Sequence, residues 1–300
     1  MNLYDTSVAV LQTVSLEQVI GKNVQLLVKR DDLIDPEVSG NKWRKLLYNI
    51  ELATFQQRKG ILTFGGAYSN HLLATAAACH KAGLHAVGVV RGEELHPESN
   101  ENLKRCAELG MELQFVDRTT YSERNEPLAI EGWKERYPNH LLVAEGGHGF
   151  YGMLGCQKMW EELPADTDHV FVALGTGTTA AGLLVGLPDE AYLHAVPVLK
   201  GFDTAIAIRE LLWQFYLDGE MVDQKMKQLV VHDDFHFGGY GKADSDLKER
   251  LRALQTDLDV PLDYVYTGKA LLACLDFIQQ SENAGKVVFI HTGGLHNAAL

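Results

Sequence analysis

Short apolar runs rich in β-branched residues alternate with longer segments of helical periodicity along almost the whole chain. The runs with the character of strands are 24–28, 60–64, 85–90, 112–116, 140–144, 169–174, 192–199, 228–232 and 286–291. The segments with helical periodicity include 43–56, 70–82, 100–109, 153–163, 179–186, 205–217 and 270–280. Because this alternation is typical of βαβ units, the pattern predicts an α/β fold built on mainly parallel sheet.

Two glycine-rich breaks interrupt this pattern, Gly65-Gly66 near the start of the chain and Gly146-Gly147-His148-Gly149 near its middle. No tract rich in Pro, Gly and Ser divides the chain into separate halves. We therefore expect a small inserted α/β domain at 48–150, within a larger α/β domain formed by 1–47 and 151–300.

The overall charge argues against two kinds of partner. The chain has 300 residues, with 27 Lys and Arg against 40 Asp and Glu, so its formal net charge is −13. An acidic chain without a block of like charge lacks the electrostatic footprint expected for a nucleic acid or an anionic membrane surface. With 46% hydrophobic and 22% charged residues, the composition excludes collagen-like, disulfide-dense and disordered classes.

The cysteines and the first residues of the chain indicate the cellular compartment in which the protein is expected. Cys79, Cys106, Cys156 and Cys274 are far apart, which predicts neither a disulfide framework nor a CxxC metal site. Segment 1–5 carries an acid where a secretory signal needs basic residues, and no apolar run approaches the roughly 18 residues of a membrane span. We therefore expect reduced thiols and a cytoplasmic protein.

A segment rich in glycine and threonine follows the expected strand at 169–174. It reads Gly175-Thr176-Gly177-Thr178-Thr179. Free backbone N–H groups at the N-terminus of the following helix attract phosphate, so the segment is a candidate phosphate cradle. The structural alternative is a tight turn with capping residues, because Gly and Thr are common in both.

The same segment matches the dinucleotide pattern GxGxxA through Gly175, Gly177 and Ala180. A nicotinamide-dependent oxidoreductase is therefore an alternative. That function needs an acidic residue about 20 positions later, at the end of the next strand, to bind a ribose. The next expected strand is followed by Lys200, which has the wrong charge, so the sequence disfavours a nicotinamide cofactor.

A second candidate segment, Gly40-Asn41-Lys42, opens an expected helix. A cation in the first helical turn faces the positive end of the helix dipole, so we expect a lowered pKa for the Lys42 amine. A lowered pKa suits a lysine that forms a covalent bond with a carbonyl compound. A solvated basic patch that includes Arg44 and Lys45 is the structural alternative.

Three further segments have candidate chemistry. Ser69, Asn70 and His71 follow a glycine-rich strand end at the start of a helix, an arrangement that suits a carboxylate ligand. Tyr240 lies between glycines, and Tyr266 follows 26 positions later. Two such tyrosines are candidates to line a cleft, although packing in the core or at its rim is more common. The last segment, His291-Thr292-Gly293-Gly294, closes the final strand.

The chain lacks the sequence motifs of several enzyme classes. There is no GxSxG, HExxH or Walker sequence, which disfavours α/β-hydrolases, zincins and P-loop enzymes. His232 and His236 have the spacing of metal ligands on a helix but follow a strand, so we expect a polar loop and no metal site.

Taken in order, these segments resemble the motifs of the D-cysteine desulfhydrase and 1-aminocyclopropane-1-carboxylate deaminase family. The motifs are GNKxRK, GGxxSNH, GTGTT, GYG, YTGKA and HTGG, and the resemblance runs from about Lys29 to Gly294. The family consists of pyridoxal 5'-phosphate enzymes of the tryptophan synthase β-like fold, fold type II. The resemblance implies two open-twisted, mainly parallel sheet domains, this cofactor, a small amino acid as substrate and a homodimer.

The resemblance also assigns roles to individual residues. Lys42 would carry the cofactor, Asn70 would bond its O3′ oxygen, Ser69 would bind the substrate carboxylate, and the Gly-Thr segment would hold the phosphate. The catalytic residues would be Lys42, Ser69, Tyr240 and Tyr266. The cofactor would be bound by Lys42, Asn70, Gly175, Thr176, Gly177, Thr178, Thr179, Thr267 and Thr292, and the substrate by Ser69, Asn70 and His71.

Two positions separate the branches of this family. In the resemblance, the deaminases have the motif YEGK at the second tyrosine, where the acid faces the pyridine nitrogen, and they have Leu before the final Gly-Gly. The desulfhydrases have Thr at both positions. This chain has Thr267 and Thr292. A carboxylate keeps the pyridine nitrogen protonated and a hydroxyl does not hold that charge, so the cofactor is a weaker electron sink. A weaker sink favours substrates with a good β-leaving group, such as thiolate.

We therefore predict a pyridoxal-phosphate-dependent lyase that performs α,β-elimination on a small amino acid, most specifically the conversion of D-cysteine to pyruvate, hydrogen sulfide and ammonia. A 1-aminocyclopropane-1-carboxylate deaminase is the alternative within the family. A nicotinamide-dependent oxidoreductase and a catalytically silent cofactor-binding protein are the alternatives from other classes.

Overall fold

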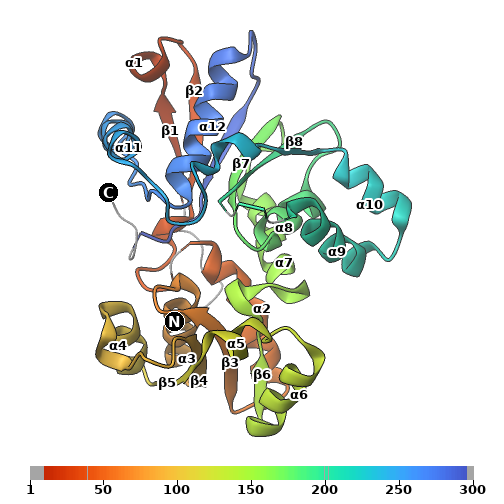
Figure 1. Cartoon of the computed structure of the whole chain (residues 1–300). Helices are drawn as coiled ribbons and strands as arrows, with labels where there is room; N and C mark the ends of the chain where they lie inside the picture. Colours follow the sequence, from red (N-terminus) through yellow and green to blue (C-terminus); the bar gives the residue numbers. More distant parts are fainter. Residues whose placement is uncertain (1–9, 39, 199, 202, 296–300) are drawn as a thin grey trace. The chain divides into compact units, whose positions relative to one another are not determined.

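Strands and helices alternate along the chain as the hydrophobic pattern predicts (Figure 1). The computed structural model describes residues 10–38, 40–198, 200–201 and 203–295. The expectation about segment 1–5, and the end of the strand expected at 192–199, concern residues that lie outside these ranges. The described strands form two sheets in which nearly all neighbours are parallel, so the predicted α/β class is confirmed.

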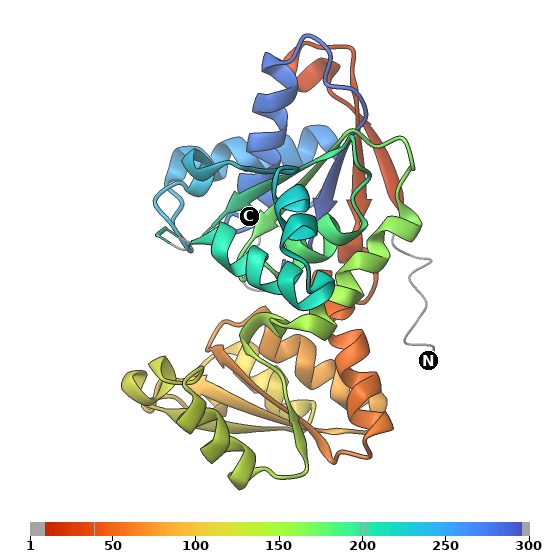
Figure 2. The same ribbon diagram turned by 90° about the vertical axis from the view of Figure 1, so that its right-hand side faces the viewer.

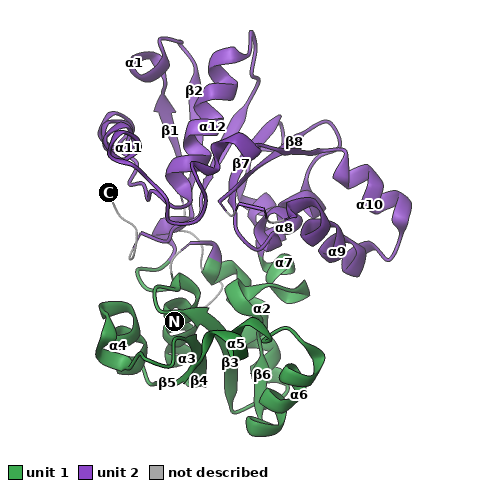
Figure 3. Cartoon of the chain, in the orientation of Figure 1, with its two compact units in different colours: residues 1–5, 35–38, 42–155 green, residues 6–34, 39–41, 156–300 purple. Residues whose placement is uncertain are grey.

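The chain divides into two compact units (Figure 3). Within the described residues, unit 1 comprises 35–38 and 42–155, and unit 2 comprises the remainder. The inserted domain expected at 48–150 stays a prediction, because compactness alone does not show that a unit folds by itself.

Unit 1 contains a four-stranded parallel sheet with the strand order β5-β4-β3-β6. Its strands are β3 (Gly60–Gly66), β4 (His85–Arg91), β5 (Met111–Val116) and β6 (His140–Leu142). Its helices are α2 (Asn41–Phe55, from its second residue), α3 (Asn70–Ala82), α4 (Glu101–Glu108), α5 (Arg118–Ser122) and α6 (Pro127–Arg136), with the 3-10 helices η2 (Pro97–Ser99) and η3 (Glu145–Gly147).

Helices cover both faces of this sheet (Figure 2). On one face, Cβ atoms built on Gly65 and Gly88 would lie 2.6 and 3.1 Å from the side chain of Leu72 in α3, so the glycines let this helix approach closely. On the other face, Phe64 packs edge-on against Trp133 of α6, with 6.2 Å between the ring centroids. Burial on both faces explains why the strands are almost continuously apolar.

Unit 2 contains a six-stranded sheet with the order β1-β2-β10-β7-β8-β9, in which only the β1–β2 pair is antiparallel. Its strands are β1 (Leu11–Ser15), β2 (Gln25–Arg30), β7 (His169–Leu174), β8 (Tyr192–Pro197), β9 (Leu229–Val231) and β10 (Val287–His291). Its helices are α1 (Glu17–Ile20), α8 (Thr178–Gly186), α9 (Thr204–Tyr216), α10 (Gly219–Met226), α11 (Ser245–Leu258) and α12 (Thr267–Gln280), with the 3-10 helices η1 (Asp31–Leu33), η4 (Lys158–Glu162) and η5 (Asp233–His236). Helix α7 (Phe150–Gln157) continues from unit 1 into unit 2.

The structure corrects two elements of the predicted pattern. The helix expected at 153–163 ends at Gln157 and continues as the 3-10 helix η4, since helix ends often tighten in this way and Pro164 holds Leu163 in an extended conformation. Strand β1 is absent from the prediction, because its five residues carry a weak apolar pattern and it pairs only with β2 at the edge of the sheet.

Candidate functional site

Asn41, the residue that opens α2, belongs to unit 2 and is bound to two distant segments of the same unit. Asn41 donates its backbone N–H to the carbonyl oxygen of Thr292 at 3.1 Å and its side-chain amide to Oγ1 of Thr179 at 2.9 Å. Gly40 has φ +65°, and a Cβ on it would lie 1.9 Å from the Thr292 carbonyl oxygen, so the position requires glycine. The fold thus brings together residues from three of the segments that the sequence singled out.

The Gly-Thr segment forms the turn from β7 into α8. Gly177 is the N-cap of α8, with φ +82°, and no side chain caps the helix. The Oγ1 atoms of Thr176 and Thr178 lie 3.3 Å apart. Because Asn41 supplies a hydrogen to Thr179, the hydroxyl proton of Thr179 remains available for another acceptor. An uncapped helix N-terminus with these hydroxyl groups is a donor set that fits a phosphate.

The two candidate tyrosines lie together beside this turn. A Cβ built on Gly175 would lie 3.5 Å from Cε1 of Tyr266. The ring of Tyr240 meets the ring of Tyr266 edge-on, with 5.9 Å between the centroids and 76° between the planes. Tyr240 is 53% exposed and Tyr266 is partly buried, so neither is a core residue. Within unit 2, tertiary packing therefore gathers the turn and both tyrosines.

Thr267 is buried and hydrogen-bonded to Asp263. Its hydroxyl donates to the Asp263 carboxylate at 2.5 Å and accepts the Asp263 N–H at 3.0 Å. The same carboxylate accepts the N–H groups of Val265, Tyr266 and Thr267 at 2.6–2.9 Å. Asp263 thereby caps the start of α12 and fixes the orientation of Thr267. Sequence analysis missed Asp263, although an Asp shortly before an apolar helical segment is a recognisable capping signal.

In unit 1, the structure defines the hydrogen-bonding state of His71, which is 2% exposed. Its Nε2 lies 2.8 Å from Oγ1 of Thr63, and the Thr63 hydroxyl donates to the carbonyl oxygen of Val143 at 2.7 Å. Since the Thr63 proton is already donated, Nε2 of His71 must carry the hydrogen between these two atoms. Its Nδ1 is then a buried acceptor, and among the described residues it has no hydrogen-bond partner.

Burial, together with two lysines of α2, keeps His71 neutral. Burial and then the charges of Lys42 and Lys45 lower the pKa of His71 well below its usual range. Lys45 is buried and its Nζ donates to the carbonyl oxygen of Gly146 at 3.3 Å, whereas Lys42 is partly exposed. Unit 1 thus places Lys42 close to a neutral imidazole that can accept a hydrogen from a ligand.

Ser69 and Asn70 lie at the start of α3. The Ser69 hydroxyl oxygen accepts the N–H of Leu72 at 3.3 Å and caps the helix, which leaves its proton for a further acceptor. Asn102 of α4 donates its side-chain amide to the carbonyl oxygens of Ala67 and Ser69, at 3.1 and 3.4 Å. Sequence analysis missed Asn102, because no motif marks it.

The predicted site residues thus fall into one group in each unit. Unit 1 holds Lys42, Ser69, Asn70 and His71. Unit 2 holds Gly175, Thr176, Gly177, Thr178, Thr179, Tyr240, Tyr266, Thr267 and Thr292. That both groups form one site stays a prediction.

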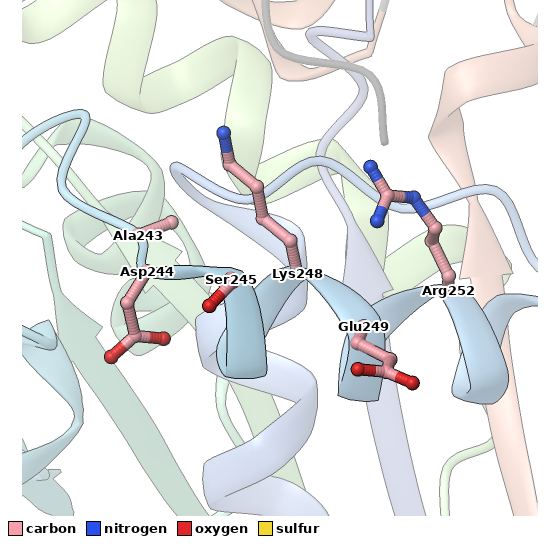
Figure 4. A pocket seen from close by; sticks show the side chains of 6 residues that line it. All are labelled: Ala243, Asp244, Ser245, Lys248, Glu249 and Arg252. Carbon is pink, nitrogen blue, oxygen red and sulfur yellow. The ribbon is translucent and has the colours of Figure 1, made fainter.

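A surface hollow lies along the first turns of α11 (Figure 4). Lys248 and Arg252 extend from the same side of this helix. The hollow is lined by Ala243, Asp244, Ser245, Lys248, Glu249 and Arg252. None of these is a predicted site residue, and the hollow has no constellation of converging donors like that of the Gly-Thr turn.

The segment considered for metal binding forms the 3-10 helix η5. Its His232 shares a ring-nitrogen hydrogen bond of 2.8 Å with His194. Throughout the part of the chain that the structure describes, no group of three or more His, Cys, Asp or Glu side chains is arranged to hold a metal ion. In the same ranges, no helix combines the length and apolar character needed to cross a bilayer.

Comparisons with known proteins agree with this geometry. Residues 8–293 match the family described as "Pyridoxal-phosphate dependent enzyme". A Pyrococcus furiosus protein named "Putative 1-aminocyclopropane-1-carboxylate deaminase" is 32% identical, over 97% of this chain and 90% of that protein. A "D-cysteine desulfhydrase" of Yersinia pestis is 29% identical, over 90% of this chain and 86% of that protein.

Among solved structures, the crystal structure of an "ACC deaminase homologue" aligns with a TM-score of 0.75 at 28% identity. The alignment covers 96% of this chain and 90% of that one. These matches confirm the predicted fold type, the predicted cofactor and the resemblance seen in the motifs. The chain therefore belongs to the family of pyridoxal-phosphate-dependent enzymes, in the group that includes proteins named as 1-aminocyclopropane-1-carboxylate deaminases and D-cysteine desulfhydrases.

Proposed function

We propose that this enzyme is a lyase that eliminates the β-substituent of a small amino acid, and that D-cysteine is its substrate. The products are pyruvate, hydrogen sulfide and ammonia, with one water consumed. The observation that carries the proposal is Thr267, an uncharged residue that follows Tyr266 where the deaminase pattern has a carboxylate, and whose hydroxyl is held by Asp263. A hydroxyl holds a proton on the pyridine nitrogen less firmly than a carboxylate does, which favours substrates with a good leaving group.

The proposed cofactor-binding residues come from both units. The uncapped start of α8, with the hydroxyl groups of Thr176, Thr178 and Thr179, supplies donors for its phosphate. Lys42 supplies the amine for its covalent attachment, and Asn70 supplies an amide for its ring oxygen. When bound, pyridoxal phosphate provides the electron sink for bond breaking at the α-carbon of the substrate.

The side chains of this enzyme then bind the substrate and move protons. The Nζ of Lys42 takes the α-proton, and the free proton of the Ser69 hydroxyl is donated to the substrate carboxylate. The Nδ1 of His71, which has no hydrogen-bond partner among the described residues, accepts a hydrogen from the ligand, since burial above all keeps the ring neutral. The hydroxyl groups of Tyr240 and Tyr266 position the leaving group and assist proton transfer.

Deamination of 1-aminocyclopropane-1-carboxylate is the second candidate function. It is favoured by the names of relatives at 30–32% identity, against 29% for the relatives named as desulfhydrases. A difference of this size does not decide between substrates, because residues at a few positions can select one substrate over another.

A panel assay tests the proposal. The purified enzyme is supplied with pyridoxal phosphate and offered D-cysteine, L-cysteine, β-chloro-D-alanine, D-serine and 1-aminocyclopropane-1-carboxylate, while keto acid, ammonia and sulfide are measured. We expect keto acid from D-cysteine and β-chloro-D-alanine, and no turnover of the cyclopropane substrate. Turnover of the cyclopropane substrate without turnover of D-cysteine would reverse the choice between the two functions.

We also propose a cytoplasmic location and a homodimer. The four cysteines are free and buried, as is typical of proteins from a reducing compartment. Fractionation of the source cells and light scattering of the purified protein test these two proposals.

A further inference from the structure

The first two turns of α12 contain a lysine that is fully buried. Lys269 is 0% exposed, and its Nζ donates to the carbonyl oxygens of His236 at 2.8 Å and Gly239 at 2.9 Å. Burial lowers its pKa to about 8, partly offset by the nearby charge of Asp263. Because burial of an ammonium group costs free energy, the two hydrogen bonds are the contacts that compensate for this position.

The segment that Lys269 binds has an irregular backbone. Phe237, Gly238, Gly239 and Gly241 all have positive φ, at 47°, 87°, 110° and 66°. Such a run of left-handed residues forms no helix or strand ladder. Two local hydrogen bonds close it, from the Gly239 N–H to the His236 carbonyl oxygen at 3.0 Å and from the Lys242 N–H to the Gly239 carbonyl oxygen at 3.2 Å, and Lys269 adds a second, charged donor to each of these carbonyl oxygens. The two carbonyl groups bound by Lys269 lie on either side of Phe237 and Gly238.

Tyr240 is the residue that this turn presents. It lies between Gly239 and Gly241, is half exposed, and meets the ring of Tyr266 edge-on. Tyr266, the N-cap residue of α12, precedes Lys269 by three residues, so the two lie about one turn apart at the start of this helix. One helical turn thus provides the lysine that holds the 236–241 segment and the aromatic ring that this segment packs against.

We propose that Lys269 is the positioning residue of the tyrosine pair: by donating to the carbonyl groups of His236 and Gly239, it fixes the turn that holds Tyr240 against Tyr266. The role of the two tyrosines at the substrate is taken from the proposed function. The hydrogen bonds of Lys269 and the ring contact lie within unit 2 and do not depend on that role.

Lys269→Met is the test variant, because methionine retains most of the apolar volume and removes every donor. Lys225→Met is the matched control: Lys225 is also buried in unit 2, and its Nζ donates to the carbonyl oxygen of Leu187 at 2.7 Å, in a contact with no candidate site residue. Both variants lose an ammonium–carbonyl hydrogen bond, but only the first acts on the 236–241 segment.

Amide hydrogen exchange of the full-length protein is the first measurement. We expect Lys269→Met to speed exchange of peptides covering 236–242 by about tenfold or more, the effect of losing a charge-assisted hydrogen bond. Lys225→Met should leave these peptides unchanged and affect those around Leu187. If Lys269→Met does not fold, Lys269→Leu, which likewise has no donor, serves for the same comparison. Unchanged exchange at 236–242 in a folded variant would overturn the proposal.

A double-mutant cycle with Tyr240→Phe is the second measurement. If Lys269 acts through Tyr240, Lys269→Met lowers kcat for D-cysteine in the wild type but has little further effect in Tyr240→Phe. Independent, multiplying losses would show a merely structural role and overturn the proposal. If no amino acid is turned over at all, the proposed function fails, while the exchange experiment still decides the positioning role.

Discussion

Asn41 donates its side-chain amide to the hydroxyl oxygen of Thr179 at 2.9 Å, although 138 positions separate the two residues. This bond connects the residue before Lys42 with the helix start that we propose binds the cofactor phosphate. It also determines the hydrogen-bonding state of Thr179, since an oxygen that receives a hydrogen from Asn41 keeps its own proton for a different acceptor.

Replacement of Thr179 with Val should weaken cofactor binding more than folding. Valine has nearly the volume of threonine but removes the hydroxyl, and a lost charge-assisted hydrogen bond costs on the order of 1.5–3 kcal/mol, or roughly tenfold or more in affinity. The measurement is a titration of the apoenzyme with pyridoxal phosphate. Thr179→Ser, which keeps the hydroxyl, is the control and should bind the cofactor more tightly than the valine variant. Equal affinity of Thr179→Val, Thr176→Val and the wild type would place the phosphate elsewhere.

Reduction with borohydride should fix the cofactor to a single lysine, Lys42. The prediction rests on its position at the start of α2, next to Asn41 and close to His71. Peptide mapping by mass spectrometry identifies the modified residue. Lys42→Ala should lose both the visible absorbance and the label, whereas Lys45→Met should retain the label. Attachment to Lys45 or Lys269 would contradict the assignment of Lys42.

Replacement of Gly40 with Ala should destabilise unit 2 and weaken cofactor binding. The added Cβ would overlap the Thr292 carbonyl oxygen, which accepts the N–H of Asn41, and the residue has a positive φ. We expect a loss of at least about 1–3 kcal/mol in the free energy of unfolding. Gly132→Ala is the contrasting control: Gly132 is exposed in α6, and apart from the backbone of this helix and the neighbouring residues no atom lies within 4 Å of the new Cβ, so the substitution should stabilise by about 0.5–1 kcal/mol. Urea unfolding measures both, and similar effects of the two substitutions would refute the predicted clash.

Stability should fall as the medium becomes acidic, because three imidazoles form a row across β7, β8 and the end of β9, with the buried His194 at its centre and the partly buried His169 and His232 on either side. His194 bonds His169 at 2.9 Å and His232 at 2.8 Å through ring nitrogens. Burial, then the charges of His232 and His169, lower the pKa of His194 to about 3. The unfolded chain, with a pKa near 6.5, binds more protons than the folded chain below that pH. The stabilising effect is therefore complete above about pH 6.5 and is lost progressively as the pH falls towards about 3.

Urea unfolding at pH 8, 6.5 and 5.5 measures this dependence. His194→Leu should reduce the slope of stability against pH below 6.5 by up to about 1.4 kcal/mol per pH unit, the value for one proton. Equal stability of the wild type at pH 8 and pH 5.5 would contradict the prediction.

The glutamate of the deaminase pattern suggests the substitution Thr267→Glu, and the structure shows that this single change is not a clean test. Thr267→Glu would test whether a carboxylate at this position protonates the pyridine nitrogen, but Asp263 already occupies the space next to the Thr267 hydroxyl. Two buried carboxylates in contact repel each other, and one of them becomes protonated. The double variant Asp263→Asn, Thr267→Glu is therefore the informative form of this experiment.

The sequence by itself determined many of the elements and the family. The predicted strand 169–174 and helix 70–82 coincide with β7 and α3, because apolar periodicity, the Ser69 cap and the Gly83 stop are all local signals. The order of six short motifs was enough to predict the cofactor, because that order resembles the motifs of a known family whose cofactor is pyridoxal phosphate.

Only the tertiary structure decided which groups meet and in what hydrogen-bonding state. The hydrogen on Nε2 of His71 follows from Val143, 80 positions after Thr63, and Lys269 binds Gly239 across 30 positions. Neither contact has a local pattern, because it depends on how helices and strands pack. A hydrogen bond between distant residues requires positions accurate to a few tenths of an ångström, and the period of apolar residues fixes a face of an element but not such a distance.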